Sequence, residues 1–191
     1  MLVNLRRAVA LSIVLIVLCL VYTGVETLIG QVAFKYQANG SLVKQGNTVI
    51  ASANIGQQWA GPACFQGRDD PDNPAASGPT SYGPRSEQLY EQVQQASAAL
   101  KKEGITPTNG LVTGSGSGID PDISPADAAA QVNAVAKADN LPVAEVKALV
   151  AKYSAPVYLG AFGSPYVNLF SINTALAKVV PNLSCVVHTA G

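Results

Sequence analysis

The chain has 191 residues, which is enough for one modest domain and a membrane segment but not for several independent cores. Its 12 Lys and Arg balance its 12 Asp and Glu, so no basic excess indicates nucleic-acid binding and no acidic excess indicates a charged tail. Only 13% of the residues are charged, which is low for a soluble domain, and the missing charge is concentrated at the N-terminus.

The N-terminal segment predicts a single transmembrane helix. The run from Ala8 to Val25 contains no charged residue, and a helix of this length spans about 27 Å, enough for a hydrocarbon core. Arg6 and Arg7 precede the run, and the next positive residue is Lys35. The positive-inside rule therefore predicts a cytoplasmic N-terminus and an extracytoplasmic C-terminal domain, in a single-pass protein of the cell (plasma) membrane.

The main alternative for this segment is a cleaved signal peptide, whose apolar region is shorter and ends in a small-x-small site. The run continues through residues 22–26 without such a site, and Leu18 disfavours a lipoprotein at Cys19. We therefore expect an uncleaved anchor over residues 1–33 and one soluble domain over residues 34–191.

Small and weakly polar residues gather on one face of this helix. Such faces are where membrane helices pack on one another, so the face is a hypothesis for contact with a partner helix. Ordinary lipid-facing scatter remains the alternative. The face consists of Ser12, Ile16, Cys19 and Thr23.

The first half of the predicted domain contains a hairpin, a long loop and a helix. Residues 42–44 and 48–50 read as two strands around the turn 45–47. Residues 61–84 are rich in Pro, Gly, Ser and Asp and predict a long loop. Residues 86–103 predict a helix that ends at Gly104. Its apolar face carries Leu89, Val93, Ala96 and Leu100.

The second half predicts short strands between capped helices. Residues 111–113 are expected as a strand, and Ser124 as the N-cap of a helix that runs to about Asp139, with Pro125 and Asp127 in its first turn. Further elements are a helix from Pro142 to about Tyr153, a strand over 157–162, and a last helix capped by Asn168 that bears Leu169, Ile172 and Leu176. The expected fold class is mixed α/β (α+β): one transmembrane helix, then a single mixed α/β domain.

No catalytic or phosphate-binding motif is visible. No glycine is followed by lysine, so a Walker A motif is absent. The run Gly114–Gly118 has Ile119 at the last glycine position of GxGxxG, which favours a flexible turn over a dinucleotide loop. The aspartyl-phosphate motif Asp-Lys-Thr-Gly-Thr is also missing, His188 is the only histidine, and no acid/base carboxylate pair stands out. No catalytic residue and no metal site is predicted.

Two weaker features leave alternatives open. The acidic residues of the long loop could bind calcium outside the cell, although a solvated loop is favoured; they are Asp69, Asp70, Asp72 and Asn73. Pro121 and Pro125 break any EF-hand loop around Asp120 and Asp122. Cys64 and Cys185 could form a disulfide if the domain is exported.

Six blocks in order behind one membrane span resemble the C chain of the Kdp potassium pump, a P-type ATPase complex. They are residues 37–42, 55–57, 65–68, 73–78, 111–125 and 163–169. The fifth block continues to Ala128 and Gln131, and the last includes Asn173 and Leu176. Outside the glycine-rich run, the motif residues singled out in these blocks are Gly56, Gln57, Gly67, Arg68, Ser77, Gly78 and Asn168. The chain departs from the family pattern at Gln66, Asp69, Asp139, Pro142 and in the tail after Val179.

The resemblance implies a non-catalytic accessory subunit in the lipid membrane. Its expected partners are a channel-like chain that carries the potassium filter and the P-type ATPase chain that hydrolyses ATP. The C chain is held to assist assembly and to raise the ATP affinity of the hydrolysing chain. No firmly bound cofactor is expected, and contact with ATP is expected only through the complex. The residues suspected of a nucleotide-affinity or interaction role are Gly114, Ser115, Gly116, Ser117, Gly118 and Asp120.

The predicted topology disagrees with direct ATP contact, because an extracytoplasmic domain does not meet cytoplasmic ATP. We therefore favour a cover over the outer face of the channel-like chain. The alternative is a membrane-anchored extracytoplasmic binding module whose ligand site is the loop 61–84, since long ordered loops are often functional.

Overall fold

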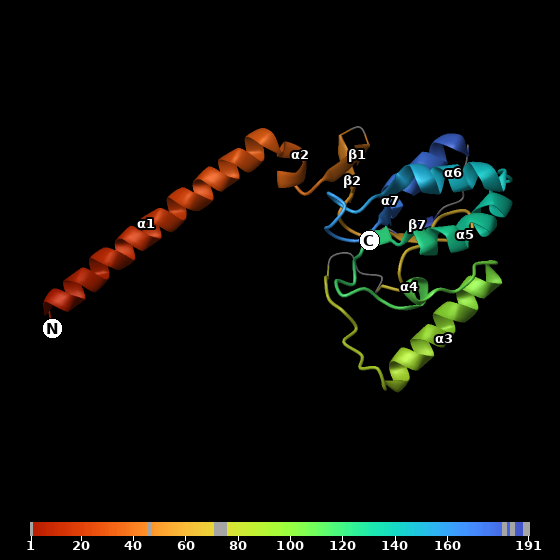
Figure 1. The fold of residues 1–191 in the computed structure, drawn as a ribbon, viewed down its shortest axis with the longest axis horizontal. Helices are drawn as coiled ribbons and strands as arrows, with labels where there is room; N and C mark the ends of the chain where they lie inside the picture. Colours follow the sequence, from red (N-terminus) through yellow and green to blue (C-terminus); the bar gives the residue numbers. More distant parts are fainter. Residues whose placement is uncertain (1, 46, 71–75, 181–182, 184–185, 189–191) are drawn as a thin grey trace. The chain divides into compact units, whose positions relative to one another are not determined.

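A computed structural model describes residues 2–45, 47–70, 76–180, 183 and 186–188. The chain separates into two compact units, residues 1–52 and residues 53–191, and each is described by itself. Figure 1 shows the elements of both in sequence colours. The predicted boundary between residues 33 and 34 stays a prediction.

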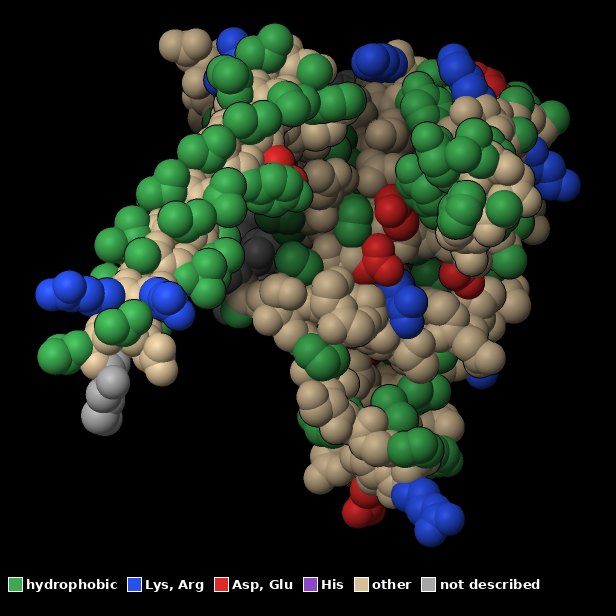
Figure 2. All heavy atoms as spheres, turned by 60° about the vertical axis from the view of Figure 1, so that its left-hand side comes forward, with side chains coloured by type: hydrophobic (Ala, Val, Ile, Leu, Met, Phe, Trp, Pro, Cys, Tyr) green, Lys and Arg blue, Asp and Glu red, His purple; other side chains and the backbone are tan. Residues whose placement is uncertain are grey.

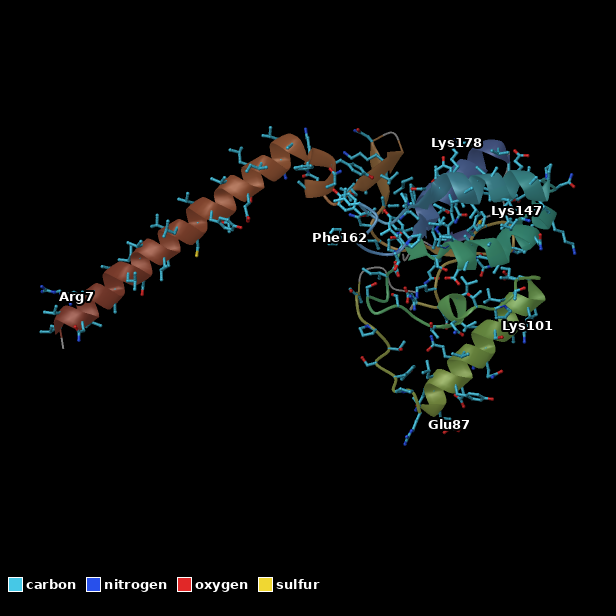
Figure 3. The ribbon with its side chains drawn as sticks, viewed as in Figure 1. Arg7, Glu87, Lys101, Lys147, Phe162 and Lys178 are labelled. Atoms are coloured by element: carbon cyan, nitrogen blue, oxygen red, sulfur yellow. The ribbon has the colours of Figure 1, made fainter. Side chains whose placement is uncertain are left out.

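The first unit begins with the predicted apolar helix, α1 (Leu2–Ala33). Within the described part of the chain it is the one helix whose length and composition suit a membrane span. None of its side chains is buried by the rest of the chain. Figure 2 shows hydrophobic side chains over most of its length, and Figure 3 places Arg7 near its N-terminal end.

A short helix and a hairpin complete this unit. After α2 (Lys35–Ala38), β1 (Leu42–Gln45) and β2 (Thr48–Ser52) pair antiparallel, as the sequence predicted. The Ser52 hydroxyl donates a 2.7 Å hydrogen bond to the Gly40 carbonyl, which joins the end of β2 to the segment before β1. Gly46, in the predicted turn, lies outside the described residues.

The second unit combines helices with three-residue and two-residue strands, which confirms the mixed α/β class. β6 lies between β4 and β5 in one antiparallel sheet, and β3 pairs antiparallel with β7. The elements in chain order are β3 (Gln58–Ala60), α3 (Glu87–Lys102), α4 (Asn109–Val112), β4 (Asp122–Ile123), α5 (Pro125–Ala138), α6 (Val143–Tyr153), β5 (Ser154–Ala155), β6 (Tyr166–Asn168), α7 (Leu169–Val179) and β7 (Val186–His188).

The core of this unit lies among α5, α6 and α7, which are grouped together in Figure 1. Each helix contributes an apolar stripe at the helical period, and the stripes meet around the fully buried ring of Phe65. The largest buried side chains of the three helices are Val132, Val135, Val146, Leu169, Ile172 and Leu176. Leu100, from the predicted face of α3, is also buried, and Val93 and Ala96 pack against the same cluster.

The two predicted helix caps are confirmed. The side chains of Ser124 and Asn168 accept hydrogen bonds from the first-turn amides of α5 and α7. Ser86, predicted as the first residue of a helix, is instead the N-cap of α3 and accepts from the Leu89 amide. At α5 the cap is reciprocal, because the Asp127 carboxylate accepts from the backbone of Ser124. Gly104, with φ +77°, follows α3 as predicted.

Two predicted strands are wrong. Residues 111–113 belong mostly to the short helix α4, because the Thr108 hydroxyl accepts from the Leu111 amide and caps it. Residues 157–162 form a tight turn closed by one isolated bridge between Tyr158 and Phe162. Leu159 and Gly160 have φ of +51° and +72°, which a strand does not allow.

The cysteines are only partly accounted for by the described residues. Cys64 is fully buried and disulfide-bonded, whereas Cys19 is free and exposed on α1. Cys185, the partner considered for Cys64, lies outside the described residues, as do Asp72 and Asn73 of the acidic loop. Because the Cys64 sulfur is in a disulfide, labelling with a thiol reagent does not show whether this residue is accessible.

Two buried amide side chains hold the backbone of Phe65 and Gln66. Asn173 accepts from the Phe65 amide at 2.9 Å and donates to the Phe65 carbonyl at 2.8 Å. Gln131 does the same for Gln66, at 2.7 Å and 3.0 Å. Because both side chains are almost completely buried, they satisfy backbone groups that no water reaches. We call Asn173 and Gln131 the amide clamp.

Removing half of the clamp is expected to destabilise the second unit strongly. Asn173→Ala leaves a buried N–H and a buried C=O without partners, which costs about 2–4 kcal/mol. Chemical denaturation of the full chain in detergent measures this loss. Asn133→Ala, at an exposed position of α5, is the matched control and should change the free energy of unfolding little. Equal stability of the two variants would contradict the clamp.

Asp139 is expected to reduce stability at neutral pH. It is the C-cap of α5, where negative charge is unfavourable, and its Oδ2 is buried with no partner among the described residues. Burial raises the pKa of this carboxyl above its usual 3.8. The folded state therefore binds the proton more tightly than the unfolded state, and stability is lost as pH rises through the folded-state pKa.

Asp139→Asn should therefore stabilise the chain by about 0.3–1 kcal/mol at pH 7, and the gain should vanish below pH 3.8. Thermal unfolding at several pH values measures this difference. Glu87→Gln, in the first turn of α3, removes a favourable charge and should have the opposite sign. A gain from Asp139→Asn that does not depend on pH would contradict the assignment.

Candidate functional site

The motif loops predicted from the sequence converge on one region of the second unit. A common small cavity is lined by residues 56–58, 67–68, 70 and 118–120 together with Leu169. These segments are far apart in sequence, yet backbone hydrogen bonds and two charged side chains connect them. We call this region the loop junction.

Asp70 is the centre of the loop junction. One carboxylate oxygen accepts from the Ser115 amide, and the other accepts from the Ser115 hydroxyl at 2.7 Å and from the Asp120 amide at 3.1 Å. The glycine-serine run is thus wrapped around a carboxylate of the chain itself. Hydrogen bonds to a carboxylate are shorter and stronger than those between neutral groups.

Arg68 fixes the start of the same run from the other side. Its guanidinium donates to the carbonyl oxygens of Thr113 at 3.3 Å and Gly114 at 2.9 Å. It also lies 3.4 Å from the Thr113 hydroxyl. The planar guanidinium of arginine can donate to several acceptors at once. Arg68 and Asp70 therefore both hold residues 113–120 by hydrogen bonds.

Two amides at the end of the glycine-serine run donate to hydroxyls within the run itself. The Gly118 amide donates to the Ser115 hydroxyl at 2.9 Å, and the Ile119 amide donates to the Ser117 hydroxyl at 3.2 Å. A phosphate-binding loop presents such amides to its ligand. Here the amides of Ser115, Gly118, Ile119 and Asp120 already donate to oxygens of the chain.

Glycine is required at two places in the junction by close backbone approach. The Gly56 amide donates to the Ile119 carbonyl at 2.8 Å, and a Cβ at Gly56 would lie 2.7 Å from the Asp120 carbonyl oxygen. Gly118 has φ +69°, and a Cβ there would collide with the Gly78 carbonyl. Gly78 in turn donates to the Ser117 carbonyl at 2.7 Å.

The other predicted loop residues have smaller structural roles. The Ser77 hydroxyl donates to the Ser117 carbonyl at 3.0 Å, and Gly67 passes close to Leu169. The Gln57 amide nitrogen lies 3.2 Å from the carbonyls of Ile55 and Gly56, both in its own turn. The structure therefore brings Gly56, Gly67, Arg68 and the glycine-serine run together, with Ser77 and Gly78 against Ser117.

Asn168 connects this region to α7. Its amide nitrogen donates to the Ala53 carbonyl at 3.1 Å and to the Asp122 carboxylate at 2.9 Å, while its oxygen caps α7 at Ser171. Burial raises the pKa of Asp122; the hydrogen bond from Asn168 opposes this shift, and the neighbouring Asp120 adds to it. Asn168 is thus a cap and a bridge at once.

The cavity at the junction is too small for a nucleotide. Its volume is about 20 Å³, room for one water, whereas small-molecule sites enclose about 300–1,000 Å³. No group of three or more His, Cys, Asp or Glu suited to a metal occurs among the described residues. The junction joins loops into one body, and the nucleotide-affinity role suggested for residues 114–118 and Asp120 stays a prediction.

The predicted membrane-helix face is exposed along α1. The hydroxyls of Ser12 and Thr23 donate to the carbonyls of Ala8 and Cys19, each at 2.9 Å, so they are satisfied within the helix. Ile16 and Cys19 are exposed between them. Contact of this face with a partner helix stays a prediction.

The sequence reasoning missed the central role of Asp70 and the amide clamp. Asp70 was noted only within an acidic loop, since nothing local shows that it meets Ser115. The signal that could have found it is an acidic loop residue together with a downstream run of glycine and serine amides. Gln131 and Asn173 carry a clearer signal, because each is a polar residue on the apolar face of a helix.

Asp70→Ala is expected to loosen residues 114–120 while the helical core stays folded. Three donors lose their acceptor, and a loss of about 1.4 kcal/mol of local protection corresponds to about tenfold faster exchange. Hydrogen exchange of the Ser115 and Asp120 amides measures this effect. Glu91→Ala, on the exposed side of α3, is the control. Unchanged exchange in residues 114–120 would show that Asp70 does not organise the run.

Comparison with known proteins places the whole chain in one family. The family "K+-transporting ATPase, c chain" (KdpC) matches residues 5–178. A potassium-transporting ATPase KdpC subunit of Allorhizobium ampelinum is 41% identical over 185 residues, 92% of this chain and 96% of that protein. The subunit of Burkholderia orbicola is 43% identical over 182 residues, covering 90% and 94%.

A third relative, the KdpC subunit of Paraburkholderia phytofirmans, is 41% identical over 169 residues, 84% of this chain and 88% of that protein. The resemblance inferred from the ordered motif blocks is confirmed by these matches. The chain belongs to the KdpC family and is the c-chain subunit of a K+-transporting ATPase complex.

Proposed function

We propose that the chain is a non-catalytic accessory subunit that assists assembly and covers the outer face of the complex. In this proposal α1 lies in the cell membrane with its N-terminus in the cytoplasm, and residues 53–191 lie outside the cytoplasm. The partners are a channel-like potassium-binding chain and the P-type ATPase chain.

The observation that carries this proposal is the complete exposure of α1. A helix of 32 residues has no side chain buried by the rest of its own chain, so its apolar surface needs lipid or another helix. Transmembrane association is driven by packing and by hydrogen bonds between helices. A single span does not form an ion pathway alone, because a filter needs several converging elements.

The charge distribution along α1 supports the orientation. Arg6 and Arg7 flank its N-terminal end, whereas the opposite end contains Glu26 and is followed by Lys35 only after the helix. Under the positive-inside rule the arginine end stays in the cytoplasm. The disulfide at Cys64 also fits an oxidising compartment for the second unit.

We propose further that any effect on ATP affinity passes through the complex rather than through direct contact. The amides of Ser115, Gly118 and Ile119 already donate to Asp70 or to serine hydroxyls, so a phosphate would have to displace these contacts. An approaching phosphate would also meet the negative charges of Asp70 and Asp120. A rigid loop junction suits a domain that presents a fixed surface to its partners.

An anchored binding module remains the alternative, with residues 61–84 as the ligand site. The described part of that loop is tied down by its neighbours: Gln58 donates to the Asp70 carbonyl at 3.0 Å, and Gln92 donates to the Asp69 carboxylate at 2.7 Å. These contacts favour a structural loop over a loop that opens to take a ligand.

Purification of the tagged chain from native membranes tests the proposal. We expect two larger membrane chains to copurify, with potassium-stimulated ATP hydrolysis in the same fraction. Recovery of the chain alone under mild detergent would contradict the accessory role.

The orientation is tested in the same cells by adding one cysteine at a time to a Cys19→Ser chain, which keeps Cys64 and Cys185. Ala98→Cys, at an exposed position of α3, should react with an impermeant thiol reagent in intact cells. Asn4→Cys, near the N-terminal end of α1, is the matched control and should react only after permeabilisation. The reverse pattern would overturn the topology and restore direct nucleotide contact as a mechanism.

A further inference from the structure

An exposed apolar turn lies between β5 and β6. Tyr158, Leu159 and Phe162 are 71%, 78% and 64% exposed. Figure 3 shows Phe162 at the edge of the second unit, away from the packed helices. Single exposed hydrophobic residues are ordinary, but three within five positions form a patch that needs an explanation. We call residues 157–163 the apolar turn.

Four backbone amides of the apolar turn donate to carbonyls of the turn itself. The Tyr158 amide donates to the Phe162 carbonyl and the Phe162 amide donates to the Tyr158 carbonyl, both at 3.0 Å. The amides of Gly160 and Ala161 donate to the carbonyls of Val157 and Tyr158, both at 3.2 Å. Each such pairing lowers the cost of moving the segment from water toward an apolar medium.

Leu159 occupies a backbone conformation that leucine rarely adopts. Its φ of +51° lies in the left-handed region, where glycine or asparagine is easily accommodated. Its side chain is exposed, so it gains little from packing within the chain. Because this conformation is unfavourable and the side chain is exposed, we infer that Leu159 serves a contact with another molecule rather than the stability of the fold.

The composition around the turn favours lipid over a protein partner. No charged residue occurs between Lys152 and Lys178. Within the turn, the Tyr158 hydroxyl is the only polar side-chain group. Protein interfaces carry a polar rim and about one hydrogen bond per 100–200 Å², which this turn has little means to supply. Tyrosine, leucine and phenylalanine are the types that sit at a membrane–water interface.

We propose that the apolar turn inserts into the interfacial layer of the bilayer as a second, shallow membrane contact. The same chain carries α1, and only residues 34–52 separate it from the second unit. This segment reaches at most about 65 Å when fully extended, so the bilayer surface is at high effective concentration for the turn. The proposal does not depend on which side of the membrane the unit occupies.

The test uses the full chain, with Cys19→Ser, in phosphatidylcholine nanodiscs. A spin label at Leu159→Cys should collide with oxygen in preference to a soluble nickel chelate, with a ratio several-fold higher than a label at Ala98→Cys. Because no charge is involved, this ratio should not change in about 1 M salt. A water-like ratio at residue 159, or a loss of contact in high salt, would overturn the proposal.

A second measurement identifies what covers the turn without relying on Leu159. A photo-crosslinking phenylalanine analogue at Phe162, in the intact complex in nanodiscs, should give lipid adducts by mass spectrometry. Crosslinking to a partner chain or to a second copy would contradict lipid contact. These outcomes are independent of the copurification result, so failure of the accessory role and failure of the lipid contact are distinguishable.

Discussion

The backbone of Phe65 and Gln66 is held from both sides by the amide clamp, and the position of the motif loops depends on this contact. The clamp fixes the chain where it leaves the core, so Arg68 and Asp70, a few residues later, reach residues 113–120. Two helices, α5 and α7, supply the clamp from within the packed core. The packing of the core therefore fixes the position of the loop junction, and the loop junction fixes the surface that these loops present.

The glycine-serine run shows how one sequence pattern can serve a purpose other than its familiar one. Runs of glycine and serine amides make good anion sites because they present several N–H donors in one direction. Here the anion is the carboxylate of Asp70, covalently part of the same chain and permanently present. The amides of Ser115 and Asp120 therefore have an acceptor without any ligand, and the contact joins two loops of the chain.

Local signals predicted the helices well and the short strands poorly. Ser124 and Asn168 were identified as caps because a cap is encoded within four residues. The strands predicted over 111–113 and 157–162 are wrong, and β4 and β5 were not predicted. Both errors have the same cause. β4 and β5 have two residues each and exist only because β6 pairs with both, and no periodicity appears in so short a segment.

The sequence by itself determined the apolar span, the order of the capped helices and the family, because these depend on contiguous residues or on motifs in fixed order. Only the tertiary structure decided what the motifs do. The contacts of Asp70 with Ser115, of Gln131 with Gln66 and of Asn173 with Phe65 join residues 45, 65 and 108 positions apart. Such pairings are set by how the core packs and where it directs each loop, which no local pattern records.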